Sequence, residues 1–197
     1  MSELSAICVF CGSASGDDPA FRKATVAVGD LLVARGITLV YGGGSVGLMG
    51  VLADTVLGAG GDVVGVLPRD LFVRESVHRG VSELVEVSSM HERKQRMYER
   101  ADAFLTLPGG LGTLEELAEI ATWAQLGLHR KPIGILEVAG YFAPLITFLD
   151  RAVERGFLEA DTRAAIVHDD DPARLLELLT TTTPAPTGRW ITSPERT

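Results

Sequence analysis

The chain has 197 residues, of which 46% are hydrophobic and 22% charged, and this composition is typical of one globular domain with a buried core. Its net charge of −8 argues against a nucleic acid or an anionic membrane surface as the main partner. No apolar run approaches the roughly 20 residues of a membrane span, and no basic leader precedes an apolar stretch at the N-terminus, so we expect a cytoplasmic protein.

Short apolar runs alternate with helical stretches along the chain, which favours an α/β fold built on a parallel sheet. Strands are expected at residues 6–10, 37–41, 63–67, 84–87, 103–107, 133–136 and 165–167. Helices are expected at residues 19–35, 90–100, 113–126 and 141–155, the first after an Asp18 cap and the second after a Ser89-x-x-Glu92 capping box. The pattern predicts a single Rossmann-like, doubly wound sheet of about seven strands over residues 1–179, followed by a flexible tail at 180–197.

The only two cysteines, Cys8 and Cys11, form a C-x-x-C pattern that suggests a redox or metal motif. They lie in or next to the first predicted strand, where positions three apart face opposite sides of the sheet. Two sulfurs placed in this way neither bridge nor chelate together, so we expect a structural role for both. The histidines have no ligand spacing, and we expect no metal site; they are His78, His91, His129 and His168.

Glycines follow several of the predicted strands, at the edge of the sheet where doubly wound folds bind ligands. The segments concerned are Gly12-Ser13, 42–47, 68–79 and 108–116. A single glycine loop is a weak signal, but two at the strand ends of one small domain predict a composite pocket.

The segment 42–47 matches the dinucleotide fingerprint G-x-G-x-x-G and follows a predicted strand. A nicotinamide oxidoreductase is disfavoured because the next strand ends Leu67-Pro68-Arg69, without the acidic residue that binds the ribose. Asp62 precedes that strand and therefore lies at the wrong edge of the sheet, and no Tyr-x-x-x-Lys pair is present. The alternative for this loop is that its glycines serve tight turning and close packing of a helix on the sheet.

The most informative stretch is 106–116, in which an apolar strand ends in Pro108 and three glycines and a helix follows at once. Unpaired backbone N–H groups and the helix dipole both favour an anion there, and a phosphate is the expected occupant. Glu116 places a carboxylate beside this anion. Thr113-x-x-Glu116 equally fits a capping box, in which both side chains only satisfy helix N–H groups.

A pair of adjacent cations, Arg93 and Lys94, stands near the start of the predicted helix at 90–100, where the helix dipole disfavours positive charge. The same strand-end face carries the predicted anion site. Arginine suits bidentate contact to a phosphate or a base edge, and lysine acts as a point charge. A solvated helix face is the simpler interpretation, and it suffices for Arg96 and Arg100.

Together these residues resemble the LOG (Lonely Guy) family of cytokinin riboside 5′-monophosphate phosphoribohydrolases. The resemblance rests on M-H-x-R-K at 90–94 joined to P-G-G-x-G-T-x-x-E at 108–116, with further similarity at 11–13, 41–50 and 122–127. It covers about residues 5–179. It implies hydrolysis of the N-glycosidic bond of an N6-modified AMP, and of AMP itself, to the free base and ribose 5-phosphate.

The resemblance also implies roles for individual residues. Arg93 and Glu116 are expected to be catalytic, with the arginine at the leaving base and the carboxylate at the sugar carbon or at the attacking water. Residues of the two motifs are expected to bind the nucleotide, with the phosphate on Gly110, Gly112 and Thr113; the others are Met90, Lys94, Gly109, Leu111, Leu114 and Glu115. Outside the motifs, substrate contacts are expected from Ser13, Gly43, Gly44, Glu75 and Thr122. The family implies no cofactor, no metal and a homodimer.

Two other functions compete with this interpretation. The family has often carried the label lysine decarboxylase, but only Lys23, Lys94 and Lys131 are present to form a pyridoxal Schiff base. A non-catalytic nucleotide or molybdenum-cofactor carrier would have a similar glycine loop and sheet. A carrier has no chemical need for the pair Arg93 and Glu116, which favours the hydrolase.

Overall fold

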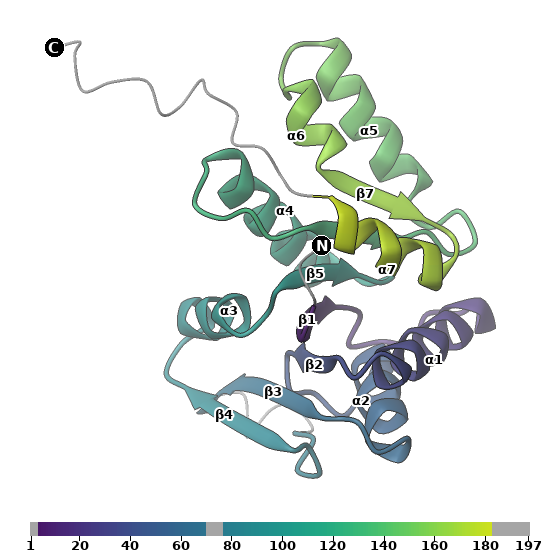
Figure 1. The fold of residues 1–197 in the computed structure, drawn as a ribbon, viewed down its shortest axis with the longest axis vertical. Helices are drawn as coiled ribbons and strands as arrows, with labels where there is room; N and C mark the ends of the chain where they lie inside the picture. Colours follow the sequence, from purple (N-terminus) through teal and green to yellow (C-terminus); the bar gives the residue numbers. More distant parts are fainter. Residues whose placement is uncertain (1–3, 70–76, 183–197) are drawn as a thin grey trace, which may run out of the picture.

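The computed structural model describes residues 4–69 and 77–182. Seven parallel strands form one sheet in the order β4-β3-β2-β1-β5-β6-β7 (Figure 1), which confirms the predicted doubly wound α/β fold. The strands lie within about two residues of their predicted positions. They are β1 Ala6–Phe10, β2 Thr38–Tyr41, β3 Val63–Pro68, β4 Glu83–Val87, β5 Ala103–Thr106, β6 Ile133–Leu136 and β7 Ile166–Asp169.

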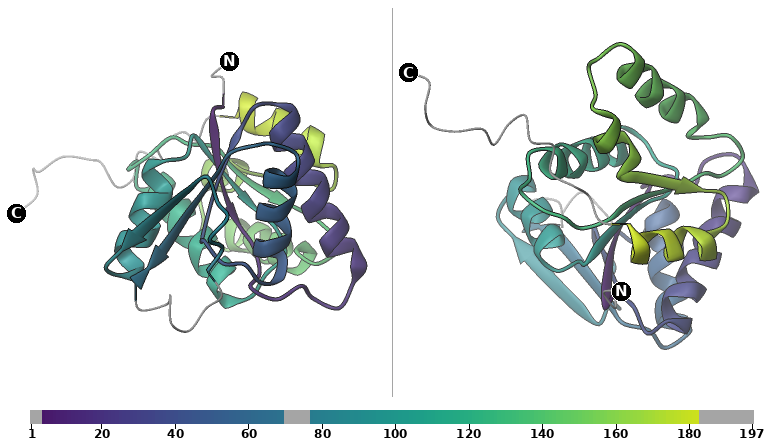
Figure 2. Two further views of the ribbon diagram at one scale, coloured as in Figure 1. Left: turned by 90° about the horizontal axis from the view of Figure 1, so that it is seen from below. Right: turned by 45° about the horizontal axis from the view of Figure 1, so that its top comes forward.

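Helices cover both faces of the sheet, as Figures 1 and 2 show. One face packs against α1 (Pro19–Ala34), α2 (Gly47–Gly58) and α7 (Pro172–Thr181). The other packs against α3 (Met90–Glu99), α4 (Leu111–Gln125) and α5 (Ala143–Glu154), with the short α6 (Ala160–Ala164) beside α4. None of the helices in the described residues is long and apolar enough to cross a membrane.

The two cysteines point to opposite faces of the sheet. Cys8 belongs to the core cluster under α3 and α4, and Cys11 to the cluster under α1 and α2. Both thiols are free and buried, and burial raises the pKa of each above its usual range. The prediction that the two sulfurs face opposite sides of the sheet and do not bridge is therefore confirmed. Across residues 4–69 and 77–182, His, Cys, Asp and Glu side chains form no group of three that could hold a metal ion.

Helix starts follow the predicted caps at α1 and α3 but not at α4. The Asp18 carboxylate accepts from the N–H of Ala20 at 2.8 Å, and the Ser89 hydroxyl accepts from the N–H of Glu92 at 3.1 Å. The Glu92 carboxylate accepts from the N–H of Ser88 instead of the Ser89 N–H that a capping box requires. The helix predicted at residues 113–126 is α4, which begins two residues earlier, at Leu111, with Gly110 as its N-cap.

Strands β2 to β4 are added on one side of β1 and strands β5 to β7 on the other, so the strand order reverses between β1 and β5. The loops after these two strands are joined by a hydrogen bond. Gly12 donates its N–H to the carbonyl of Pro108 at 3.0 Å. The Gly12 carbonyl in turn accepts from the N–H groups of Leu48 and Met49 at the start of α2. Because this is the topological switch point, a ligand site is expected directly above it.

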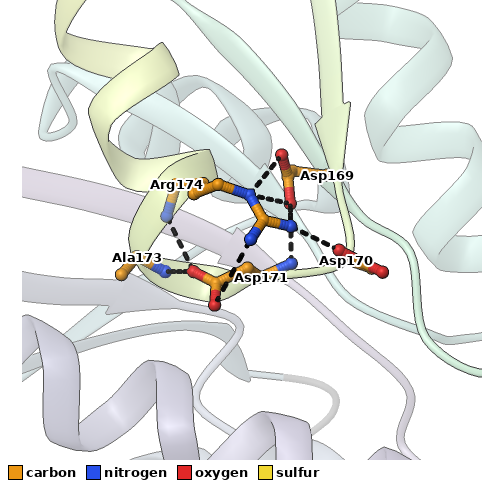
Figure 3. A network of polar contacts seen from close by, with 5 residues as sticks. All are labelled: Asp169, Asp170, Asp171, Ala173 and Arg174. Atoms are coloured by element: carbon orange, nitrogen blue, oxygen red, sulfur yellow. Dashed lines mark hydrogen bonds and ion pairs between the residues drawn. The ribbon is translucent and has the colours of Figure 1, made fainter.

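The start of α7 carries a dense polar network (Figure 3). The Asp171 carboxylate caps the helix by accepting from the N–H groups of Ala173 and Arg174, each at 2.9 Å. The Arg174 guanidinium also reaches Asp169 at 2.7 Å and Asp170 at 2.6 Å. The network fixes α7 so that its buried leucines cover the sheet. The helix ends at Thr181, so the first two residues of the predicted tail are helical, and residues 183–197 lie outside the described residues.

Replacing Asp171 by alanine is expected to lower the free energy of unfolding by about 1 kcal/mol, because two N–H groups lose their only side-chain acceptor. Replacing Asp170 by alanine removes only a surface ion pair and is expected to cost roughly half as much or less. Urea unfolding of both variants measures the difference. Equal losses would show that Asp171 acts through its charge and not as a cap.

Candidate active site

A cavity of about 310 Å³ opens above the switch point, at the carboxyl ends of β1 and β5. Its walls come from the loop after β1, the first turns of α2, α3 and α4, and the next turn of α4. The lining residues are Cys11, Gly12, Ser13, Met49, Met90, Arg93, Gly110, Leu111, Gly112, Thr113 and Glu116.

The first turn of α4 forms one wall of this cavity and is suited to an anion. Gly110 is the N-cap, and no side chain accepts from the N–H groups that follow it. The starts of α1, α3 and α7 are capped by aspartate or serine, and those of α2 and α5 have no side-chain cap either, so it is the position of α4 at the cavity that matters. The residues Gly110–Thr113 line the cavity, so their N–H groups and the positive end of the helix dipole are available to a phosphate.

Arg93 is buried, with 9% of its surface exposed, and its guanidinium is held by backbone carbonyls. Its Nε donates to Val66 at 3.1 Å and its Nη2 to Gly42 at 3.2 Å. A Cβ on Gly42 would lie 1.9 Å from that Nη2, so the glycine makes room for the guanidinium. The remaining nitrogen, Nη1, faces Met90 and Glu116 in the cavity wall.

Glu116 places its carboxylate 4.0 Å from Arg93 Nη1, and only 13% of its side chain is exposed. Burial raises the pKa of this carboxyl to about 7, against the opposing effect of the Arg93 charge. The neighbouring charge of Glu115 raises the pKa further, and Lys94 lowers it. Because Glu116 lies in the second turn of α4 and faces Arg93, its carboxylate does not cap the helix, and the capping-box alternative is wrong.

Lys94 points away from the cavity, toward α4. Its Nζ donates to Glu115 at 2.5 Å and to Glu119 at 3.0 Å, and 12% of its side chain is exposed. These carboxylates occupy the ammonium, so Lys94 holds α3 against α4 and thereby sets the spacing between Arg93 and Glu116.

The cavity brings together about half of the residues that were predicted to form the site. Those that line it are Ser13, Met90, Arg93, Gly110, Leu111, Gly112, Thr113 and Glu116. Gly109 lines a neighbouring cavity of about 260 Å³. Thr122, Leu114 and Glu115 lie on exposed parts of α4, and Thr122 donates its hydroxyl to the carbonyl of Ala118. Glu75 lies outside the described residues.

Gly43 and Gly44 do not line the cavity either. The carbonyl of Gly43 accepts from the N–H of His78 at 3.0 Å, and Gly44 forms an antiparallel bridge with Val77. Gly12 lines the cavity, as expected of the segment Gly12-Ser13, and Cys11 and Met49 line it although they were not among the predicted site residues. Their position directly after β1 and in the first turn of α2 is the signal that would have identified them.

The geometry of the glycine loop after β2 disagrees with dinucleotide binding. In that mode the N–H groups at the start of the following helix bind a pyrophosphate. Here the N–H groups of Leu48 and Met49 already donate to Gly12, at 3.0 and 3.3 Å. The loop instead serves packing and accommodates Arg93.

None of the three lysines of the chain is placed to carry a pyridoxal group in the cavity. Lys94 pairs with two carboxylates, and Lys23 lies on the exposed face of α1. Lys131 donates to the carbonyl of Tyr98 at 2.6 Å and lies over the Tyr98 ring. The decarboxylase alternative therefore has no Schiff-base lysine in the described cavity.

The structure is similar to those of molybdenum cofactor proteins. The molybdenum cofactor binding protein from Rippkaea orientalis has a TM-score of 0.66 at 21% identity, covering 89% of this chain and 95% of that one. The molybdenum cofactor carrier protein from Chlamydomonas reinhardtii has a TM-score of 0.66 at 18% identity, covering 90% and 98%. At such identities the likeness concerns the fold alone.

Comparisons of sequence find relatives with much higher identity than these structures. A family profile described as "Possible lysine decarboxylase" matches residues 49–179. Cytokinin riboside 5′-monophosphate phosphoribohydrolase LOG7 of Arabidopsis thaliana is 49% identical over 178 residues, which are 90% of this chain and 82% of that protein. Cytokinin riboside 5′-monophosphate phosphoribohydrolase LOG of Oryza sativa subsp. japonica is 51% identical over 166 residues, which are 84% of this chain and 69% of that protein. The chain therefore belongs to the LOG family of cytokinin riboside 5′-monophosphate phosphoribohydrolases.

Proposed function

We propose that this protein hydrolyses the N-glycosidic bond of N6-substituted adenosine 5′-monophosphates, and of AMP itself. Water adds across the bond between the sugar C1′ and the base nitrogen. The hydroxyl group goes to C1′, the base nitrogen receives a proton, and the products are the free base and ribose 5-phosphate.

The observation that carries this proposal is the pairing of Arg93 and Glu116 in the wall of a cavity that also contains an uncapped helix N-terminus. A carrier needs the anion site alone. A buried cation facing a buried carboxylate is suited to a reaction in which positive charge develops on one fragment and negative charge on the other.

Each group has a role that follows from its position. The Glu116 carboxylate stabilises the oxocarbenium-like sugar or accepts a proton from the attacking water, and it needs to be ionised for either role. The Arg93 guanidinium is fixed by Gly42 and Val66, so its Nη1, which faces the cavity wall beside Met90 and Glu116, stabilises charge on the departing base without reorganisation. The N–H groups at Gly110–Thr113 hold the 5′-phosphate.

The protein is further proposed to act as a cytoplasmic homodimer. Two large apolar side chains that line the cavity are exposed, Leu111 at 86% and Met90 at 43%. Exposed apolar residues gathered at one face are typical of an interface. A second copy of the chain would bury them and close the cavity from solvent.

The test is release of free base from AMP and from N6-isopentenyl-AMP by the purified protein, followed by chromatography of both products. We expect adenine or the substituted base to appear in equal amounts with ribose 5-phosphate. Binding of AMP without release from either nucleotide would contradict the hydrolase and favour a carrier. The ratio of kcat/KM for the two substrates gives the preference for the N6 substituent.

A further inference from the structure

Tyr141, which lies just before α5, reaches across to the turn that follows β5. Its hydroxyl donates to the carbonyl of Gly109 at 2.5 Å, although the two residues are 32 positions apart. The tyrosine and Gly109 both line the neighbouring cavity of about 260 Å³, and Tyr141 does not line the larger cavity that contains Arg93 and Glu116. The bond therefore acts on the glycine turn from the neighbouring cavity and not from the one that contains Arg93 and Glu116.

This hydrogen bond fixes the plane of the peptide between Gly109 and Gly110. In a trans peptide the C=O and the following N–H point in opposite directions. Because the Gly109 carbonyl points toward Tyr141, the N–H of Gly110 points away from Tyr141. Gly110 lines both cavities and is the N-cap of α4, so its N–H is added to those available at the start of that helix.

Among the described residues the Tyr141 hydroxyl is the hydrogen-bond donor to the Gly109 carbonyl, whereas the Gly109 Cα is closely packed, since a Cβ there would lie 2.1 Å from Thr113 Oγ1. The peptide that precedes the Gly109–Gly110 peptide is held by the bond from Gly12 N–H to the Pro108 carbonyl. Two consecutive glycines rotate more freely than any other pair of residues, and a Cβ at Gly110 would meet no atom within 4 Å. Without the Tyr141 hydroxyl, the Gly109–Gly110 peptide has a second orientation available in which its carbonyl, and not its N–H, faces the anion.

Although 43% of Tyr141 is exposed, two aromatic contacts orient its ring toward Gly109. The ring packs edge-on against Phe21 of α1 at 5.5 Å and against Phe142 at 5.0 Å between ring centroids. Phe142 is almost fully buried. Replacing the tyrosine by phenylalanine keeps both ring contacts and removes only the donor.

We propose that Tyr141 is a positioning residue for the phosphate of the substrate, acting through the orientation of the Gly109–Gly110 peptide. The inference rests on the proposed function, because it takes the 5′-phosphate to be the anion at α4. It assigns no contact with the reacting atoms to Tyr141.

The test is the variant Tyr141→Phe, with Tyr98→Phe as the matched control for loss of a tyrosine hydroxyl elsewhere in the fold. For Tyr141→Phe we expect KM for AMP to rise about 3- to 10-fold while kcat stays within about twofold, because a phosphate contact is made equally in the ground state and the transition state. The dissociation constant of AMP, measured by titration calorimetry, is expected to rise by the same factor. Competition by adenosine, which lacks the phosphate, is expected to be unchanged. Tyr98→Phe is expected to leave all of these quantities unchanged.

Unchanged AMP binding in Tyr141→Phe would overturn the proposal, and so would an equal weakening of AMP and adenosine, which a general packing role predicts. A loss of kcat at constant KM would overturn it as well, because it would place Tyr141 in the chemical step. The binding measurements do not require turnover. A wild-type protein that binds AMP without releasing base would therefore contradict the proposed function while still testing Tyr141.

Discussion

Replacing Glu116 by glutamine is expected to lower kcat for base release from AMP by about 10²- to 10⁴-fold, while AMP binding changes only a few-fold. Glutamine preserves the size and polarity of the side chain but carries no negative charge and accepts no proton. Because Glu116 touches no phosphate-binding N–H group, the loss is expected in kcat. The measurement is single-turnover release of adenine at pH 8, where the wild-type carboxyl is ionised according to its pKa of about 7.

Glu154→Gln is the matched control, since this carboxylate lies on the exposed end of α5, outside the cavity. It is expected to retain wild-type activity. A Glu116→Gln protein with kcat within fivefold of wild type would contradict the proposed role of the carboxylate.

Replacing Arg93 by lysine is also expected to lower kcat. Lysine keeps the positive charge but cannot make the two contacts to the carbonyls of Gly42 and Val66 that fix the guanidinium.

The wild-type protein is expected to lose stability relative to Glu116→Gln as the pH rises from 4 to 8. The folded-state pKa of Glu116 is about 7, above the usual 4.5, so the folded protein binds this proton more tightly than the unfolded chain does. The resulting stabilisation is complete below pH 4.5 and is lost as the pH rises through 7. A shift of this size corresponds to about 3 kcal/mol.

Urea unfolding of both proteins at several pH values measures this difference. We expect the free energy of unfolding of wild type, minus that of Glu116→Gln, to fall by about 3 kcal/mol between pH 4 and pH 8. Glu154→Gln, which alters an exposed carboxylate, is expected to follow wild type closely. A difference that is flat with pH would show that Glu116 ionises normally in the folded protein.

The same titration is expected in the kinetics. Below pH 7, kcat/KM for AMP is expected to fall about tenfold per pH unit, because only the ionised carboxylate of the free enzyme is active. The direction in which kcat/KM changes with pH also distinguishes a carboxylate that acts as a base from one that acts as an acid. Activity that rises as the pH falls below 7 would mean that Glu116 acts as an acid.

The sheet and most helices were predictable because they depend on local signals. Apolar runs define β1, β2, β3, β5 and β6, whereas β4 (ELVEV) and β7 (IVHD) are apolar only in part, and Asp18-Pro19 defines the start of α1. The start of α4 was placed two residues late because Thr113 and Glu116 resemble a cap, whereas the backbone conformation of Gly110 begins the helix at Leu111. Because Gly110 has no side chain to cap the helix, the sequence carries no capping residue from which the true start of α4 could be predicted.

The site was predictable in its residue types but not in its contacts. Arg93 was expected to face a ligand, yet two of its nitrogens bind carbonyls of Gly42 and Val66, which are 51 and 27 residues away in sequence. Lys94 was expected beside the substrate, and the partners of its ammonium in the structure are two carboxylates of α4, which its spacing did not predict. Such partners are determined by how α3 crosses the sheet, and neither periodicity nor spacing encodes that geometry.

The neighbouring positions of Arg93 and Lys94 have a consequence for the register of α3. Successive residues of a helix point about 100° apart, so Arg93 faces the ends of β2 and β3 while Lys94 faces α4. Met97 is the only apolar side chain of α3 that is buried among the described residues. The polar contacts of Arg93 and Lys94, which point in two directions, therefore fix the rotation of α3 about its axis more than hydrophobic contacts do. Inserting or deleting one residue within its first turn would rotate both cations off their partners at once, so the length of this turn is fixed even though its surface is solvated.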